Sequence, residues 1–189
     1  MTEQLKQATQ SVHRELEAFL IPVIRNIRTK QEYIRLLNMF YGFYKPLEDA
    51  VDAFPVVDYL PDYVHRRKAA LIVEDLRVMG EQGIPAVCTE IPDIDSIGAA
   101  FGALYVLEGS TLGGQHIAAM LRRSLYIDAS DAFQGLAFFT GYRDDTGPKW
   151  KRFREVLVPF CADQVLYKVL VSAAEQTFEK MKAWAELVY

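Results

Sequence analysis

The chain has 189 residues, of which 51% are hydrophobic and 24% charged, and this balance predicts one globular domain over residues 1–189. A net charge of −4 at pH 7, without a basic tail, argues against nucleic acid as a partner. The first residues are polar, and no apolar run approaches the roughly 18 residues that a membrane span requires. We therefore expect a cytoplasmic protein without membrane contact. Its two cysteines, Cys88 and Cys161, lack metal-ligand or redox spacing and are expected to be reduced.

Apolar residues recur three and four positions apart through most of the chain, which is typical of amphipathic helices. The pattern predicts seven helices, at 2–19, 30–53, 62–79, 96–123, 131–140, 149–160 and 163–187. Thr2 is the expected N-cap of the first helix, and Pro22 its expected end. Thr29 and Glu32 have the spacing of a capping box at the start of the second. Pro46 should kink or split that second helix, because proline lacks the N–H that an interior position donates.

Further signals mark the ends of the later helices. Asp62 is an expected N-cap for the third helix, and Gly80 suits its end. Pro148 fits the first helical position of the sixth, and Asp163 the N-cap of the seventh. No segment alternates with the period of two that strands require. The sequence therefore predicts an all-α, single-domain, multi-helix fold.

The expected helix over 96–123 carries glycines at 109, 113 and 114, and each costs roughly 1 kcal/mol relative to alanine. Two explanations fit this cost. Glycines four residues apart let a neighbouring helix approach closely, as Gly98 and Gly102 suggest. Alternatively, a flat ligand lies against the bare main chain.

The first helix places three polar residues along one edge of its apolar stripe. At 100° per residue, Lys6, His13 and Glu17 fall on the same side, with Lys6 about 10 Å along the axis from His13. A half-buried histidine in this setting is either a core residue with a hydrogen-bond partner or a ligand. The pattern of this helix alone does not separate the two.

Other chemistry has weaker support. A carboxylate-bridged di-iron bundle needs Glu-x-x-His motifs, and the nearest match is a single Asp62-x-x-His65. His65 is expected to be solvated, and Cys161 to be an inert thiol rather than a nucleophile. A flat iron-porphyrin fits better, because it needs an axial imidazole, a cation for its propionates and a close opposite wall. His13, Lys6 and the glycine-bearing helix offer these three features.

Two segments carry a resemblance to a known family. The segment Leu5–Glu17 resembles the proximal helix of heme oxygenases, and Leu107–Gln115 resembles their glycine-rich distal helix, in particular in the bacterial branch. The resemblance extends from residue 5 to about 160, with the two motifs in the family's order. It implies an all-helical domain that holds heme b between the two helices.

The resemblance also implies roles for single residues. His13 would be the axial ligand of the iron, Glu17 its partner at the other ring nitrogen, and Lys6 a contact of a heme propionate. The oxygen side of the heme would be lined by Gly109, Ser110, Gly113 and Gly114. Tyr105 lies one turn before this segment and is either a pocket residue or a core tyrosine. His116 is a weaker candidate for the iron and is expected to pack against a neighbouring helix.

The family also places basic residues near the propionates on a later helix, which Trp150–Arg154 resembles. Lys151 and Arg154 are the candidates there. An alternative is a solvated basic face, or a docking patch for an acidic electron donor. Animal members of the family carry an aspartate where this chain has Ser110. In those proteins the aspartate orders the water that protonates bound oxygen.

The implied activity is cleavage of heme to biliverdin, ferrous iron and carbon monoxide. It would use O2 and electrons from a ferredoxin or a flavin reductase. Two alternatives stay open. One is a carrier or sensor that binds heme without turnover. The other is the similar helical domain that processes thiamine fragments through a cysteine, here Cys88 or Cys161.

Overall fold

The computed structural model describes residues 2–66, 69–83, 85–125 and 135–189, and within these ranges it contains helices and no strands. The all-α prediction is therefore confirmed. The α-helices are α1 (Thr2–Ala8), α2 (Gln10–Arg25), α3 (Lys30–Asp52), α4 (Ala70–Val78), α5 (Ile97–Gly109), α6 (Thr111–Ser124), α7 (Ala137–Thr140), α8 (Thr146–Ala162) and α9 (Gln164–Val188). Three short 3-10 helices join them: η1 (Val56–Asp58), η2 (Tyr63–His65) and η3 (Arg143–Asp145).

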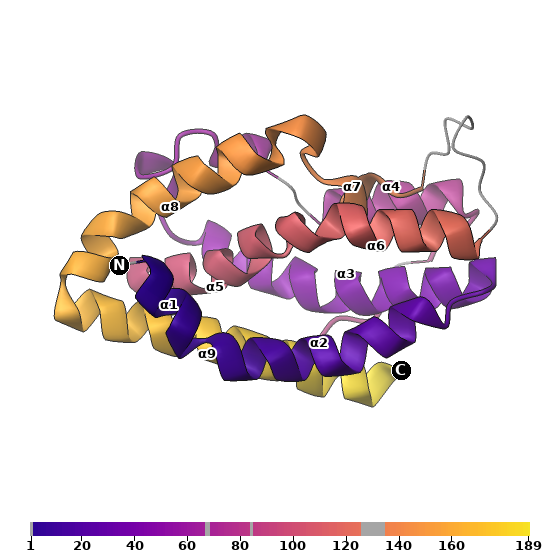
Figure 1. Cartoon of the computed structure of the whole chain (residues 1–189), viewed down its shortest axis with the longest axis horizontal. Helices are drawn as coiled ribbons and strands as arrows, with labels where there is room; N and C mark the ends of the chain where they lie inside the picture. Colours follow the sequence, from indigo (N-terminus) through magenta and orange to yellow (C-terminus); the bar gives the residue numbers. More distant parts are fainter. Residues whose placement is uncertain (1, 67–68, 84, 126–134) are drawn as a thin grey trace.

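Helix α5 forms the centre of the fold, with α3, α8 and α9 packed around it (Figure 1). All residues from 98 to 108 are buried. A Cβ atom at Gly102 would lie 2.5 Å from the carbonyl oxygen of Leu170, and one at Gly98 would lie 3.3 Å from Val169. At Gly102 only a residue without a side chain allows α5 and α9 to approach this closely, and at Gly98 a side chain would press against Val169. The packing explanation is therefore confirmed for these two glycines.

The first predicted helix is two helices in the structure. The chain bends at Thr9, where ψ is 0° and the hydroxyl donates to the carbonyl of Leu5 at 3.0 Å. The prediction that Pro22 ends the element is wrong, because α2 continues to Arg25. Ile24, two residues after the proline, is 2% exposed, so burial of this last turn offsets the missing backbone hydrogen bond.

The second helix has the predicted start. Thr29 accepts from the Glu32 N–H at 3.2 Å, while the Glu32 carboxylate accepts from the Thr29 N–H at 2.9 Å, which completes the capping box. Helix α3 then runs through Pro46 without being split. Buried residues on both sides of the proline, such as Phe43 and Leu47, hold the two halves against the core.

The prediction of one helix over 62–79 is wrong. In its place the structure has η2 and α4, and Arg66 between them has an extended backbone. The side chain of Asp62 caps no helix and instead pairs with Arg66 and Lys149. Gly80 follows α4 with a φ of +76°, as expected of a residue that ends a helix.

The glycine-bearing helix is interrupted at Ser110, so that α5 and α6 are separate elements. Of the helix predicted over 131–140, the first four residues lie outside the described ranges, and the rest contains the short α7. Helix α8 begins at Thr146, earlier than predicted. Asp163 caps α9 as predicted, accepting from the Val165 and Leu166 N–H groups. None of the described helices is long and apolar enough to cross a membrane.

Candidate functional site

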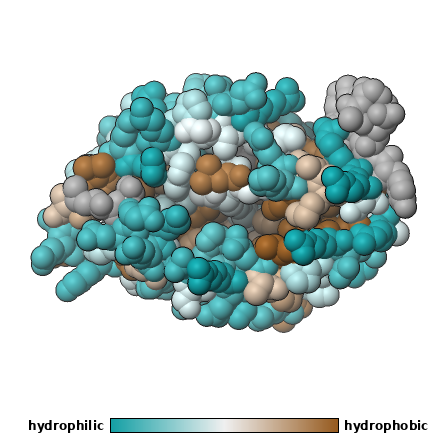
Figure 2. Space-filling view, in the orientation of Figure 1, coloured by the Kyte–Doolittle hydropathy of each residue, from teal (hydrophilic) through white to brown (hydrophobic). Residues whose placement is uncertain are grey.

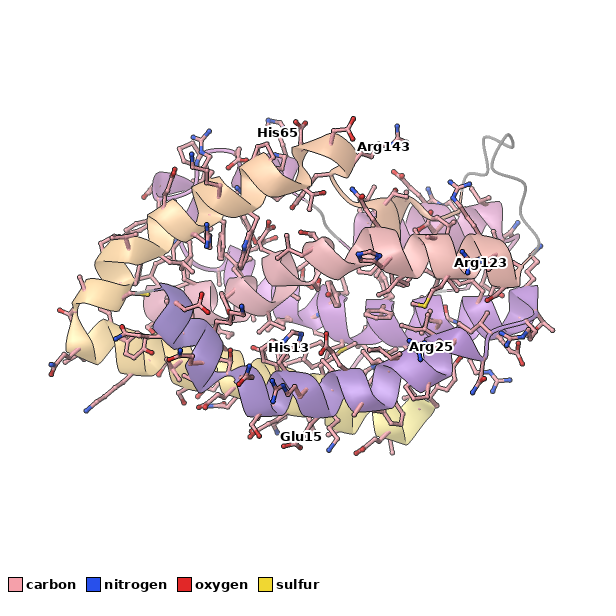
Figure 3. All side chains as sticks on the ribbon, viewed as in Figure 1. His13, Glu15, Arg25, His65, Arg123 and Arg143 are labelled. Carbon is pink, nitrogen blue, oxygen red and sulfur yellow. The ribbon has the colours of Figure 1, made fainter. Side chains whose placement is uncertain are left out.

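His13 projects from α2 toward the α5–α6 pair, whereas Glu15 projects to the opposite side (Figure 3). Its side chain is 50% exposed, and Nε2 lies 3.3 Å from Oε1 of Glu17, one turn further along α2. The ring also packs against Phe178 of α9, with ring centroids 5.0 Å apart. A carboxylate on one nitrogen and an aromatic ring on one face orient the imidazole and leave the rest of it accessible.

The three glycines of the predicted oxygen side have different surroundings. Gly113 is exposed, and apart from its chain neighbours and the nearby backbone of its own helix, no atom of the described residues lies within 4 Å of its Cβ position. The Cβ position of Gly114 instead meets the main-chain oxygen of Phe139 in α7. That of Gly109 lies 3.6 Å from the indole of Trp150, an ordinary contact. Packing therefore explains Gly114, whereas no contact with the described residues explains Gly113.

Ser110 separates α5 from α6, and two hydrogen bonds fix its side chain. Its hydroxyl lies 2.7 Å from the carbonyl oxygen of Leu107 and 2.9 Å from the hydroxyl of Tyr44 in α3. A serine has one proton to donate, and the carbonyl can only accept it. The Tyr44 hydroxyl is therefore the donor to Ser110. The aromatic pattern of α3 gave no sign of this contact, because it indicates a core residue equally well.

Lys6 lies on α1, which is separated from α2 by the bend at Thr9. It is 67% exposed and pairs with Glu3 at 3.6 Å. Tyr105 is buried, with its ring 5.7 Å from that of Trp150, and burial raises the pKa of its hydroxyl while a hydrogen bond with Thr9 opposes the rise. A direct contact between Tyr105 and a ligand stays a prediction.

Lys151 and Arg154 are exposed on α8. Their neighbours Lys149 and Arg152 face Asp62 instead, at 3.1 and 4.0 Å. Helix α1, which carries Lys6, packs against α8, which carries the two exposed cations (Figure 1).

His116 is exposed on α6, so the expectation that it packs against a neighbouring helix is wrong. His65 is exposed at the end of η2, as expected of a solvated residue. Burial raises the pKa of both the Cys88 and the Cys161 thiols, which leaves them protonated and poor nucleophiles at neutral pH. A cysteine-based activity therefore has no support from the electrostatics of this chain.

These residues fit a flat iron-bearing macrocycle. Apolar surface appears among the hydrophilic surface in the middle of the face that carries α2 and α6 (Figure 2). Partly buried apolar residues belong to both helices, namely Val12, Phe19, Leu20 and Val23 of α2 and Ile117 and Met120 of α6. An accessible imidazole, a helix surface without a side chain and apolar neighbours are what such a ligand requires.

The model of the heme oxygenase family matches residues 1–186 of this chain. The chain belongs to the heme oxygenase family. A heme oxygenase of Xanthomonas campestris pv. campestris (strain 8004) is 32% identical over 128 residues, which are 66% of this chain and 71% of the relative. As a member of this family, the chain is an enzyme that binds and degrades heme. The family resemblance that the two sequence motifs indicated is confirmed.

Solved heme oxygenases share the fold. The structure of the NO- and CO-bound heme oxygenase from Neisseria meningitidis is similar with a TM-score of 0.81, covering 98% of this chain and 90% of that chain at 20% identity. The heme oxygenase from Leptospira interrogans gives a TM-score of 0.75, covering 95% of each chain at 21% identity. The prediction of a heme oxygenase-like helical fold is confirmed.

Proposed function

We propose that this chain binds heme b between α2 and α6 and cleaves it to biliverdin, ferrous iron and carbon monoxide. Gly113 carries the proposal, since it is exposed on α6, and His13 projects from α2 toward the α5–α6 pair (Figure 3). Glycine there costs the helix about 1 kcal/mol relative to alanine, and none of the described residues fills its side-chain position in return. A flat ligand against the main chain would supply the missing contact.

In this proposal His13 would bind the heme iron. A neutral imidazole binds a metal through one nitrogen and carries its proton on the other. The Glu17 carboxylate, 3.3 Å from the ring, accepts that proton and fixes which nitrogen is free for the iron. The contact with Phe178 holds the plane of the ring.

The basic residues on α1 and α8 would orient the heme within its plane. Lys6 would contact a heme propionate, and Lys151 and Arg154 would lie near the propionates. These three side chains are exposed, so they hold the carboxylates at the edge of the site rather than inside it. The in-plane orientation would decide which bridge of the macrocycle is cleaved.

The oxygen side consists of Gly109, Ser110 and Gly113, with Gly114 contributing main chain only. Bound heme supplies the iron that activates O2 and the ring that is cleaved, with electrons from a ferredoxin or a flavin reductase. The protein supplies a bare surface that lets O2 fit, and a proton held on the Tyr44 hydroxyl beside Ser110. This hydroxyl pair takes the place of the aspartate that animal members carry.

Ser110 also favours the alternative of a heme carrier or sensor, because the carboxylate of the animal enzymes is missing. The two functions separate in one experiment. The protein is titrated with hemin, and ascorbate is then added in air. Biliverdin absorption is expected, whereas a stable heme spectrum under reducing conditions would identify a carrier or sensor.

The ligand assignment has its own test. His13→Ala should abolish the histidine-type Soret spectrum, while His116→Ala, an exposed histidine on α6, should leave it unchanged. Histidine ligation that persists in His13→Ala would contradict the assignment. A wild-type protein that takes up no hemin would contradict the proposed function as a whole.

A further inference from the structure

Glu108 is a buried carboxylate directly before Gly109, and its side chain is only 5% exposed. Both of its oxygens have partners. Arg66 Nη1 lies 2.6 Å from Oε2, and the hydroxyl of Tyr142 donates to Oε1 at 2.9 Å. A buried charge is tolerated only when it is paired and hydrogen-bonded in this way.

The partners of Glu108 are themselves anchored. Arg66 is 1% exposed, donates to the carbonyl of Lys149 at 3.2 Å, and lies 3.3 Å from a carboxylate oxygen of Asp62. Burial works against the charge of Asp62, but the hydrogen bond from Lys149 and the charge of Arg66 outweigh it and lower the pKa of the carboxyl. The resulting network ties η2, the end of α5 and the first turns of α8 together.

The connector between α7 and α8 also contacts the other end of the glycine segment. Arg143 has a φ of +52°, which is uncommon for a residue with a side chain. In this conformation its carbonyl oxygen accepts from Nε2 of Gln115 at 2.9 Å and from the Thr146 hydroxyl at 2.8 Å. Gln115 directly follows Gly114.

One short connector thus holds both flanks of the glycine segment 109–114. Tyr142 contacts Glu108 on one flank, and Arg143 contacts Gln115 on the other. Between the flanks, Gly113 has no side chain and no packing partner among the described residues. Its position therefore depends on the residues around it.

We propose that Tyr142, through Glu108, and Arg143, through Gln115, are positioning residues that set the distance of the glycine segment from the bound heme. This inference rests on the proposed function, because the segment forms the oxygen side only if heme binds beneath it. A displacement of the main chain there changes how O2 is oriented, and small misplacements of reacting groups cost large factors in rate.

The test compares Tyr142→Phe with Tyr63→Phe. Each removes one partly buried hydrogen bond from a tyrosine hydroxyl to a carboxylate, but the partner of Tyr63 is Asp52 at the end of α3, 2.5 Å away. Amide hydrogen exchange over 109–115 in heme-free protein should accelerate about three- to tenfold in Tyr142→Phe, as expected for one hydrogen bond. Tyr63→Phe should leave exchange over this segment unchanged.

The second measurement is the C–O stretching band of CO on the ferrous heme complex, together with the ratio of biliverdin isomers. Both should change in Tyr142→Phe and stay at wild-type values in Tyr63→Phe. If Tyr142→Phe does not fold, Gln115→Ala takes its place as the test variant. Gln115 is exposed, and the substitution removes its side-chain hydrogen bond to the Arg143 carbonyl.

The outcomes separate the two proposals. Faster exchange with an altered CO band supports the positioning role. A wild-type protein that binds hemin normally, with variants whose CO band is unchanged, overturns the positioning role alone, even if exchange is faster. A wild-type protein that binds no hemin overturns the proposed function and the positioning role with it.

Discussion

Gly114 and Phe139 approach each other so closely that a Cβ atom on Gly114 would overlap the main-chain oxygen of Phe139. One residue earlier, no atom of the described chain beyond the adjacent residues and the nearby backbone of α6 lies within 4 Å of the Cβ position of Gly113. The two adjacent positions are therefore glycine for different physical reasons. Gly114 makes room for α7, and Gly113 keeps an accessible surface bare. Of the two explanations that the sequence offered, helix packing accounts for Gly114, and a ligand wall stays the proposal for Gly113.

Alanine at the two positions should change stability in opposite directions. Gly113→Ala should raise the free energy of unfolding of the heme-free protein by up to about 1 kcal/mol, because alanine favours the helix and meets no neighbour. Gly114→Ala should lower it by about 1–3 kcal/mol, because the new methyl group displaces the main chain of Phe139. Urea denaturation of both variants measures the difference.

Heme binding should be impaired by the same Gly113→Ala substitution that stabilises the heme-free protein. Stabilised Gly113→Ala protein is expected to bind hemin more weakly, or to turn it over more slowly, than wild type. Unchanged hemin affinity and turnover in Gly113→Ala would show that the bare surface has no part in the site. Equal stability changes in the two alanine variants would contradict the assignment of separate roles.

The sequence predicts those features whose causes lie within a few residues. The capping box of Thr29 and Glu32 and the N-cap of Asp163 both form as expected, because each bond spans at most three residues. The imidazole–carboxylate contact of His13 and Glu17 follows from their spacing of one helical turn.

The failures have long-range causes. The prediction of a helix over 62–79 misses the pairing of Arg66 with Glu108, which lies 42 residues away and holds the chain extended at Arg66. The contact between Tyr44 and Ser110 spans 66 residues and leaves no periodic signal. Side chains that reach across the core decide these positions, and no local pattern encodes which partner is near.

Lys6 should affect the orientation of bound heme more than its affinity. Lys6→Ala is expected to lower hemin affinity at most about fivefold, because an exposed ion pair contributes no more than about 1 kcal/mol. The ratio of biliverdin isomers should change, because one propionate contact is lost. Lys182→Ala is the matched control, since Lys182 is also partly exposed and pairs with Glu15 on the opposite side of α2. An isomer ratio that changes equally in both variants would contradict a specific role for Lys6.

Tyr44→Phe should slow turnover while leaving heme uptake intact. The substitution removes the hydroxyl that donates to Ser110 but keeps the ring in the core. We expect a loss of stability of about 0.5–1.5 kcal/mol, unchanged hemin affinity and a slower appearance of biliverdin under ascorbate. Tyr33→Phe, on the same helix, removes a hydroxyl that donates to the Gly135 carbonyl and should not affect the rate. Equal rates for wild type and Tyr44→Phe would exclude the hydroxyl from proton delivery.

Asp75 should make the stability of the protein depend on pH. Its side chain is buried and accepts from the Ala137 and Phe138 N–H groups at 2.8 and 2.9 Å, at the start of α7. Burial raises the pKa of the carboxyl from 3.8 to about 6, with a smaller contribution from the charge of Glu74, although the two N–H groups oppose the rise. The folded protein therefore binds this proton more tightly than the unfolded chain does.

The sign of the effect follows from proton release. Between pH 4 and pH 6 unfolding releases the Asp75 proton, so the free energy of unfolding should fall as pH rises, by at most about 3 kcal/mol from this group. Asp75→Asn should remove this part of the slope, whereas Glu74→Gln, at an exposed position, should largely retain it. Urea unfolding of the three proteins from pH 4 to pH 7 makes the comparison. Parallel pH profiles for wild type and Asp75→Asn would show that the proton bound at Asp75 does not distinguish the folded from the unfolded state.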